Sequence, residues 1–181
     1  MSVPSTIPVF FRCQIAEGDG PPFSVEWAFA TPDLTGIVSS VHFVKPIREW
    51  ESQIFTGQAA GHARGISLAE LKKFGEDPAW IATRMNTVLK GRELYSNTNF
   101  DNDYLRRLFD AADIRPQFEL RKVSGEVHIA DFARTKRIKK SVFLNLKRKA
   151  QLRTPIYWPS VARVQADAML WADVTNAAGS I

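Results

Sequence analysis

The sequence predicts one α/β domain, in which an antiparallel β-meander is followed by helices that alternate with short strands. Three β-rich runs, at residues 7–15, 23–30 and 36–44, are separated by turn-forming segments. Residues 67–112 then carry apolar side chains at helical spacing. With 181 residues, of which 45% are hydrophobic, the chain can bury one ordinary core, so we expect a single domain over residues 1–181.

The elements follow in order from local signals. Alternation in the first strand places Arg12 and Gln14 on one face. Ser67 and Glu70 form a capping-box pattern that predicts a short helix ending near residue 75, and Pro78 begins a second helix that ends near residue 91. A short strand is expected at residues 92–96, an amphipathic helix at 103–112, and a closing Ala-rich helix at about 159–174. Residues 115–132 favour strand or loop.

Composition excludes several classes of protein. The single cysteine, Cys13, removes any disulfide framework and any Cys-rich zinc site. No apolar run is long enough to cross a bilayer, and the first residues lack the pattern of a signal peptide, so we expect a cytoplasmic protein without membrane contact. Neither GxGxxG nor GxxxxGK[ST] occurs, which argues against a dinucleotide or P-loop site.

Positive charge is concentrated in one segment. Residues 134–153 hold nine basic side chains and no acidic one, so the rest of the chain carries −4 of the total formal charge of +5. Such a segment is either an electrostatic footprint for a polyanion or a solvated helix face. The residues expected to contact nucleic acid are Arg134, Lys136, Arg137, Lys139, Lys140, Lys147, Arg148 and Lys149.

The order of elements, together with two motifs, resembles the DEDD-type 3′-to-5′ exonuclease superfamily over roughly residues 8–174. The string SNTNFD, residues 96–101, matches the middle motif of that superfamily and identifies Asp101 as the counterpart of a metal-binding carboxylate. In VQADAML, residues 164–170, Asp167 matches the final carboxylate. The resemblance implies a ribonuclease H-like mixed sheet, with a three-stranded antiparallel meander plus further strands, flanked by helices.

The sequence departs from this resemblance at the positions of the catalytic residues. Active members carry D-x-E on the first strand and a histidine five residues before the last aspartate, and they use two divalent ions to stabilise both sides of an in-line displacement. Here Arg12 and Gln14 replace the two acids, and Ala162 replaces the histidine. A guanidinium repels divalent ions, and an ion pair of Arg12 with Asp101 or Asp167 is the arrangement to expect. We therefore predict an inactive exonuclease-like protein that binds DNA or RNA and requires no cofactor.

The sequence is also compatible with two other functions. One is an adaptor subunit of a nucleoprotein complex, and the other is an active exonuclease that uses Mg²⁺ or Mn²⁺ in an altered site. Glu17 and Asp19 repeat the D-x-E spacing and could supply the missing acids, although the Gly- and Pro-rich segment around them favours a solvated turn. Tyr157 and Trp158, after the basic segment, suit either base stacking or a hydrophobic staple. The sequence does not indicate an oligomeric state.

Overall fold

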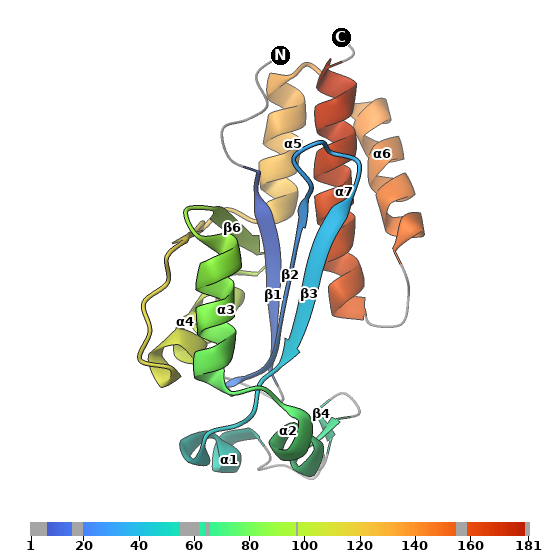
Figure 1. Ribbon diagram of the computed structural model, residues 1–181. Coiled ribbons are helices and arrows are strands. Elements are labelled where there is room, and N and C mark those ends of the chain that lie inside the picture. Colours follow the sequence, from blue (N-terminus) through green and yellow to red (C-terminus); the bar gives the residue numbers. More distant parts are fainter. Residues whose placement is uncertain are drawn as a thin grey trace.

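The computed structural model describes residues 7–15, 20–54, 62–63, 66–96, 98–154 and 159–179. Its centre is a mixed five-stranded sheet with the order β3-β2-β1-β6-β7 (Figure 1). The first three strands, β1 (Val9–Ile15), β2 (Pro22–Ala30) and β3 (Ile37–Phe43), form the antiparallel meander. The short strands β6 (Glu93–Ser96) and β7 (Glu119–Leu120) then add in parallel. The predicted α/β class and mixed sheet are confirmed.

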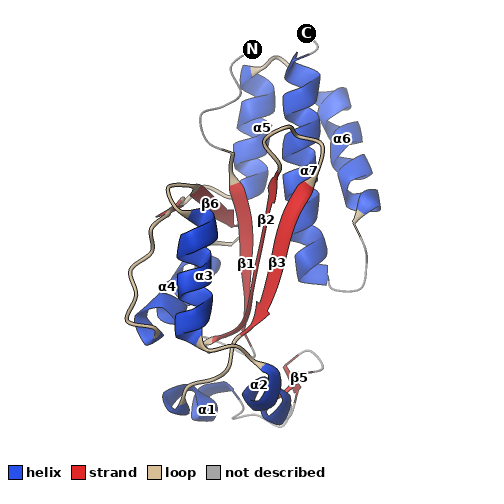
Figure 2. Cartoon of the chain, in the orientation of Figure 1, coloured by secondary structure: helices blue, strands red, loops and turns tan. Residues whose placement is uncertain are grey.

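Helices cover both faces of the sheet (Figure 2). One face packs against α3 (Pro78–Leu89) and α4 (Asn99–Ala111), and the other against α5 (Gly125–Thr135) and α7 (Pro159–Gly179). Helix α6 (Lys140–Arg153) packs mainly on α7, at the outside of the molecule. The remaining elements are α1 (Arg48–Ile54), β4 (His62–Ala63), β5 (Ile66–Ser67) and α2 (Leu68–Phe74), which lie together at one end.

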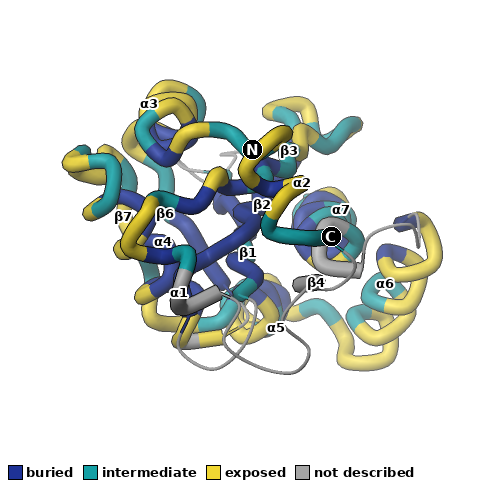
Figure 3. The backbone as a smooth tube through the Cα atoms, turned by 90° about the horizontal axis from the view of Figure 1, so that it is seen from below, coloured by how far each residue is buried: buried dark blue, intermediate teal, exposed yellow. Residues whose placement is uncertain are grey.

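Alternation along β1 divides the core into two layers. Phe11 and Cys13 pack with α3 and α4, whereas Phe10 packs with α5 and α7. Opposite α7, strand β2 presents the small side chains Ala28 and Ala30, so the helix lies close to the sheet. Figure 3 shows the buried central strands and the exposed outer surface of α6.

Most of the predicted local signals are found in the structure. The capping box is present, with the Ser67 hydroxyl accepting from the Glu70 N–H and the Glu70 carboxylate accepting from the Ser67 N–H. Asp77 caps α3, and Gly91 follows that helix with φ +71°. One prediction is wrong in large part: residues 115–132 contain the two-residue strand β7, but also most of α5, which is capped by Ser124. Helix α1 was also not predicted.

Within the part of the chain that the structure describes, no helix combines the length and the apolar character needed to cross a lipid bilayer.

Candidate functional site

The first part of the site is formed where β1 extends past its neighbour β6. Parallel pairing between the two strands covers Val9 to Phe11, and β6 ends at Ser96. The next outward N–H of β1, that of Cys13, is instead bound by a side chain: Asp101 Oδ1 accepts from it at 3.0 Å. Asp101 thus completes hydrogen bonding that a longer β6 would otherwise supply.

Asp101 is held in place on both sides of its carboxylate. Its Oδ2 accepts from the Thr98 hydroxyl at 2.9 Å, and Thr98 in turn caps α4 by accepting from the Asp101 N–H. The side chain is only 2% exposed. Burial raises the pKa of Asp101, while the hydrogen bonds from Cys13 and Thr98 and the charge of Arg12 act in the opposite direction.

The position that would carry the second acid of the D-x-E motif belongs to a different network. Gln14 Nε2 donates to Glu26 Oε1 on β2 at 2.5 Å, and the Ser24 hydroxyl donates to the same oxygen at 2.9 Å. All three side chains are buried. Sequence reasoning missed Glu26; the available signal was a polar alternation, Ser24 and Glu26, in an otherwise apolar strand.

Arg12 lies directly opposite Glu26 in the β1–β2 register. Within the described residues, its guanidinium makes no ion pair within 4 Å with Asp101 or Asp167, so the expected direct pairing is not found. Its influence on Asp101 is a longer-range charge interaction that lowers the pKa of the carboxyl. Arg12 Nε is buried and has no hydrogen-bond partner among the described residues.

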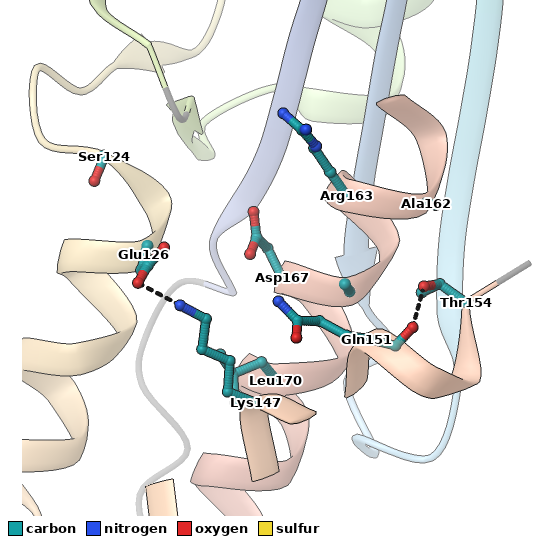
Figure 4. Close-up of a pocket in the computed structure, with 10 residues that line it drawn as sticks. Ser124, Glu126, Lys147, Gln151, Thr154, Ala162, Arg163, Asp167 and Leu170 are labelled. Carbon is teal, nitrogen blue, oxygen red and sulfur yellow. Dashed lines mark hydrogen bonds and ion pairs between the residues drawn. The ribbon is translucent and has the colours of Figure 1, made fainter. Parts of the chain in front are cut away.

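The second part of the site is a cavity of about 470 Å³ between α5, α6 and α7. Ala162 and Asp167 both line it, which brings two of the positions identified from sequence to one surface. In Figure 4, Asp167 and Arg163 extend from the same side of α7, as expected for residues four apart on a helix. Ala162 leaves that part of the wall without a titratable group.

The described residues of the cavity wall carry two positive and two negative formal charges. Lys147 of α6 forms an ion pair with Glu126 of α5, with 2.5 Å between Nζ and Oε1 (Figure 4). Arg163 and Asp167 supply the other two formal charges, and Gln151 adds an amide. Arg163 is exposed and has no ion-pair partner among the described residues.

The structure divides the eight basic residues expected to bind nucleic acid. Lys147 lines the cavity, and Arg148 and Lys149 are its exposed neighbours on α6. The other five lie around the turn between α5 and α6, at the helix ends that are distant from the cavity. They are Arg134, Lys136, Arg137, Lys139 and Lys140. At 1.5 Å per residue, Lys140 and Lys147 lie about 10 Å apart along the helix axis. All five are exposed, and Arg134 pairs with Asp131 at 3.0 Å.

The described residues of β1 next to Asp101 are poor ligands for a divalent metal. Arg12 carries a positive charge, Gln14 presents a neutral amide whose nitrogen donates to Glu26, and each oxygen of Asp101 accepts one hydrogen bond. No cluster of three or more His, Cys, Asp or Glu side chains suited to a metal ion occurs among the described residues. Glu17, Asp19, Tyr157 and Trp158 lie outside the described residues.

Comparison with known proteins gives a likeness in fold. No family model matches the sequence, and no curated protein matches it. Among solved structures, exonuclease X in complex with 5′-overhanging duplex DNA is similar with a TM-score of 0.51 and 14% identity, covering 95% of this chain and 93% of that chain. Escherichia coli exonuclease I in complex with a dT13 oligonucleotide is similar with a TM-score of 0.51 and 14% identity over 96% of this chain.

A structure of SSB/exonuclease I in complex with the inhibitor CFAM is similar with a TM-score of 0.50 and 18% identity over 71% of this chain. The present chain spans 40% of the E. coli exonuclease I chain and 30% of the chain in the inhibitor complex. The chain therefore shares the exonuclease fold with these structures.

Proposed function

We propose that this protein binds nucleic acid with an exonuclease-type fold that has lost two-metal cleavage. One observation carries the proposal: Gln14 donates its amide to the buried Glu26, at a position where the superfamily resemblance requires a metal-binding acid. The neutral amide of Gln14 lacks the negative charge of a carboxylate, and its nitrogen, which does not bind metals, already donates to Glu26. Arg12, two residues earlier, adds a positive charge to the same face.

The exposed basic residues of α6 and of the α5–α6 turn support binding of a polyanion. Each cation that neutralises a phosphate releases condensed counterions, which gives affinity without sequence preference. The complexes with DNA concern exonuclease X and exonuclease I, and their fold similarity favours nucleic acid over other polyanions for this chain.

Two measurements test the proposal. Affinity for single-stranded and duplex DNA and RNA is measured against salt concentration, and a steep linear fall of log affinity with log salt is expected. End-labelled oligonucleotides are then incubated with Mg²⁺ or Mn²⁺, where no shortening is expected. Cleavage by the wild type that is absent from Asp101→Asn and from a matched mock preparation would show an active nuclease. Affinity that does not depend on salt would argue against phosphate contacts.

A second candidate, an adaptor function, is favoured by the outer face of α6. Leu144 and Leu152 are 52% and 74% exposed, and Arg148 lies between them at four-residue spacing. Apolar side chains next to a cation suit an acidic, partly apolar protein segment. Co-purification before and after nuclease treatment distinguishes a protein partner, which stays bound, from one held through nucleic acid.

A further inference from the structure

We propose that the cavity between α5, α6 and α7 is a phosphate site for a nucleotide, and that Glu126 competes with this phosphate for Lys147. This inference rests on the proposed function and specifies where and how the protein holds one phosphate group of its ligand. The competing pair is visible in Figure 4, where Lys147 reaches across the cavity from α6 to Glu126.

The size and lining of the cavity suit a nucleotide. Its volume of about 470 Å³ lies within the range of small-ligand pockets. Two of its wall residues, Lys147 and Arg163, are cations of the kind that donate to phosphate oxygens, and Gln151 offers a further polar group. The carboxylate of Asp167 lies on the same wall. Ala162, Ala166 and Leu170 provide an apolar wall for a sugar or base.

The ion pair explains how the cavity remains neutral without a ligand. Among the described residues that line the cavity, Lys147 and Arg163 balance Glu126 and Asp167, so their formal charges sum to zero. The side chains of Lys147 and Glu126 are 30% and 57% exposed. Because solvent screens such a pair, separating it costs little, and a phosphate that carries more charge than one carboxylate can displace Glu126.

The proposal predicts opposite effects for the two partners of the pair. Glu126→Gln frees Lys147 and gives the wall a net charge of +1, so affinity for thymidine monophosphate is expected to rise about threefold. Lys147→Gln removes a charge-assisted donor, and affinity is expected to fall about fivefold or more. Both residues are partly exposed, so both variants are expected to fold, which a thermal melt checks.

Matched controls separate a local effect from general electrostatics. Asp131→Asn removes one charge and one ion pair, with Arg134, from the same helix α5, but Asp131 does not line the cavity. Lys149→Gln removes one charge from the exposed side of α6, also outside the cavity. If each control shifts nucleotide affinity as much as its partner variant, the cavity is not the site and the proposal is wrong.

The choice of probe distinguishes the source of the phosphate. Titration calorimetry is carried out with thymidine, thymidine 3′- and 5′-monophosphate, a thymidine dinucleotide and inorganic phosphate. Binding of the nucleotides without binding of thymidine supports the proposal. If inorganic phosphate binds as tightly as the nucleotides, the cavity is an anion site without nucleotide recognition, and the proposal is wrong. Long nucleic acid that binds equally to wild type, Glu126→Gln and Lys147→Gln would overturn the cavity assignment while leaving nucleic-acid binding intact. Nucleotide binding in the cavity without binding of long strands would instead overturn the proposed function.

Discussion

Asp101 offers the sharpest test of whether its buried carboxylate stabilises the fold through hydrogen bonds. Replacement by alanine removes the acceptor for the Cys13 N–H and for the Thr98 hydroxyl. The Cys13 N–H is then left buried without a partner, at a cost of about 1–3 kcal/mol, and loss of the second hydrogen bond adds about 1 kcal/mol. We expect Asp101→Ala to lower the free energy of unfolding by about 2–4 kcal/mol.

Asp101→Asn is expected to behave differently. The asparagine side chain keeps an oxygen for the Cys13 N–H, and its amide can donate to the Thr98 hydroxyl, which can act as acceptor. Because burial raises the pKa of Asp101, the folded state favours the neutral form more than the unfolded state does. Removing the charge therefore keeps or increases stability at pH 7, and we expect a change of less than about 0.5 kcal/mol in the destabilising direction.

The two variants also differ from wild type in their dependence on pH. A raised folded-state pKa means that wild-type stability falls as pH rises from the unfolded value of 3.8 through the folded value. Asp101→Asn lacks this contribution. Urea unfolding, followed by the fluorescence of the buried Trp27 and Trp171, measures all three proteins at several pH values. If Asp101→Asn is as unstable as Asp101→Ala, the negative charge itself stabilises the fold. The explanation by hydrogen bonds from Cys13 and Thr98 is then wrong.

Three further substitutions test other parts of the structure. Gln14→Glu places a second carboxylate against Glu26 in a buried site. In urea unfolding at pH 7 we expect the free energy of unfolding to fall by about 2–4 kcal/mol, and by less at lower pH. An unchanged unfolding midpoint would contradict the hydrogen-bond network of Gln14 and Glu26. His128 lies between Tyr95 and Trp171, and burial lowers its pKa against the opposing charge of Glu93. The neutral His128 therefore contributes stability above its unfolded pKa of about 6.5, and this contribution is lost as pH falls through the lower folded pKa. In His128→Gln, the free energy of unfolding should vary less with pH over this range. In Gly75→Ala the new Cβ would clash with the Leu71 carbonyl oxygen and with the backbone of Lys45, so a lower melting temperature is expected, by an amount equivalent to about 2 kcal/mol or more.

Much of the fold could be predicted because its local signals agree with its tertiary contacts. The capping box of α2 and the alternation of β1 are examples. Helix α5 could not be predicted because Val127 and Ile129 alternate as in a strand, while Ile129 and Ala133 also share a helical face. Packing of Ile129 and Ala133 in the same core layer as Trp171 of α7 favours the helix. That contact joins residues far apart in the sequence.

The candidate site was less predictable, because it depends on register and on helix packing. Asp101, Asp167 and Ala162 were selected as candidates from motif spacing alone, and their roles stay a prediction. The partner of Gln14 depends on how β2 pairs with β1. The cavity needs three helices in place, and the pairing of Lys147 with Glu126 joins two of them. The basic segment is continuous in sequence, yet a turn and a helix divide it into two surfaces.

The residues at positions 14 and 26 are best understood as a pair. A buried carboxylate at position 26 requires hydrogen-bond donors, and Gln14 and Ser24 both supply one to the same oxygen. An ionised glutamate at position 14 could not donate to Glu26, so the amide of Gln14 and the carboxyl group of Glu26 are complementary. The carboxyl group on this face of the sheet therefore lies on β2, where Gln14 and Ser24 donate hydrogen bonds to it. Glu26 also lies opposite Arg12 in the strand register, so Arg12 and Gln14 of β1 both face this one residue of β2.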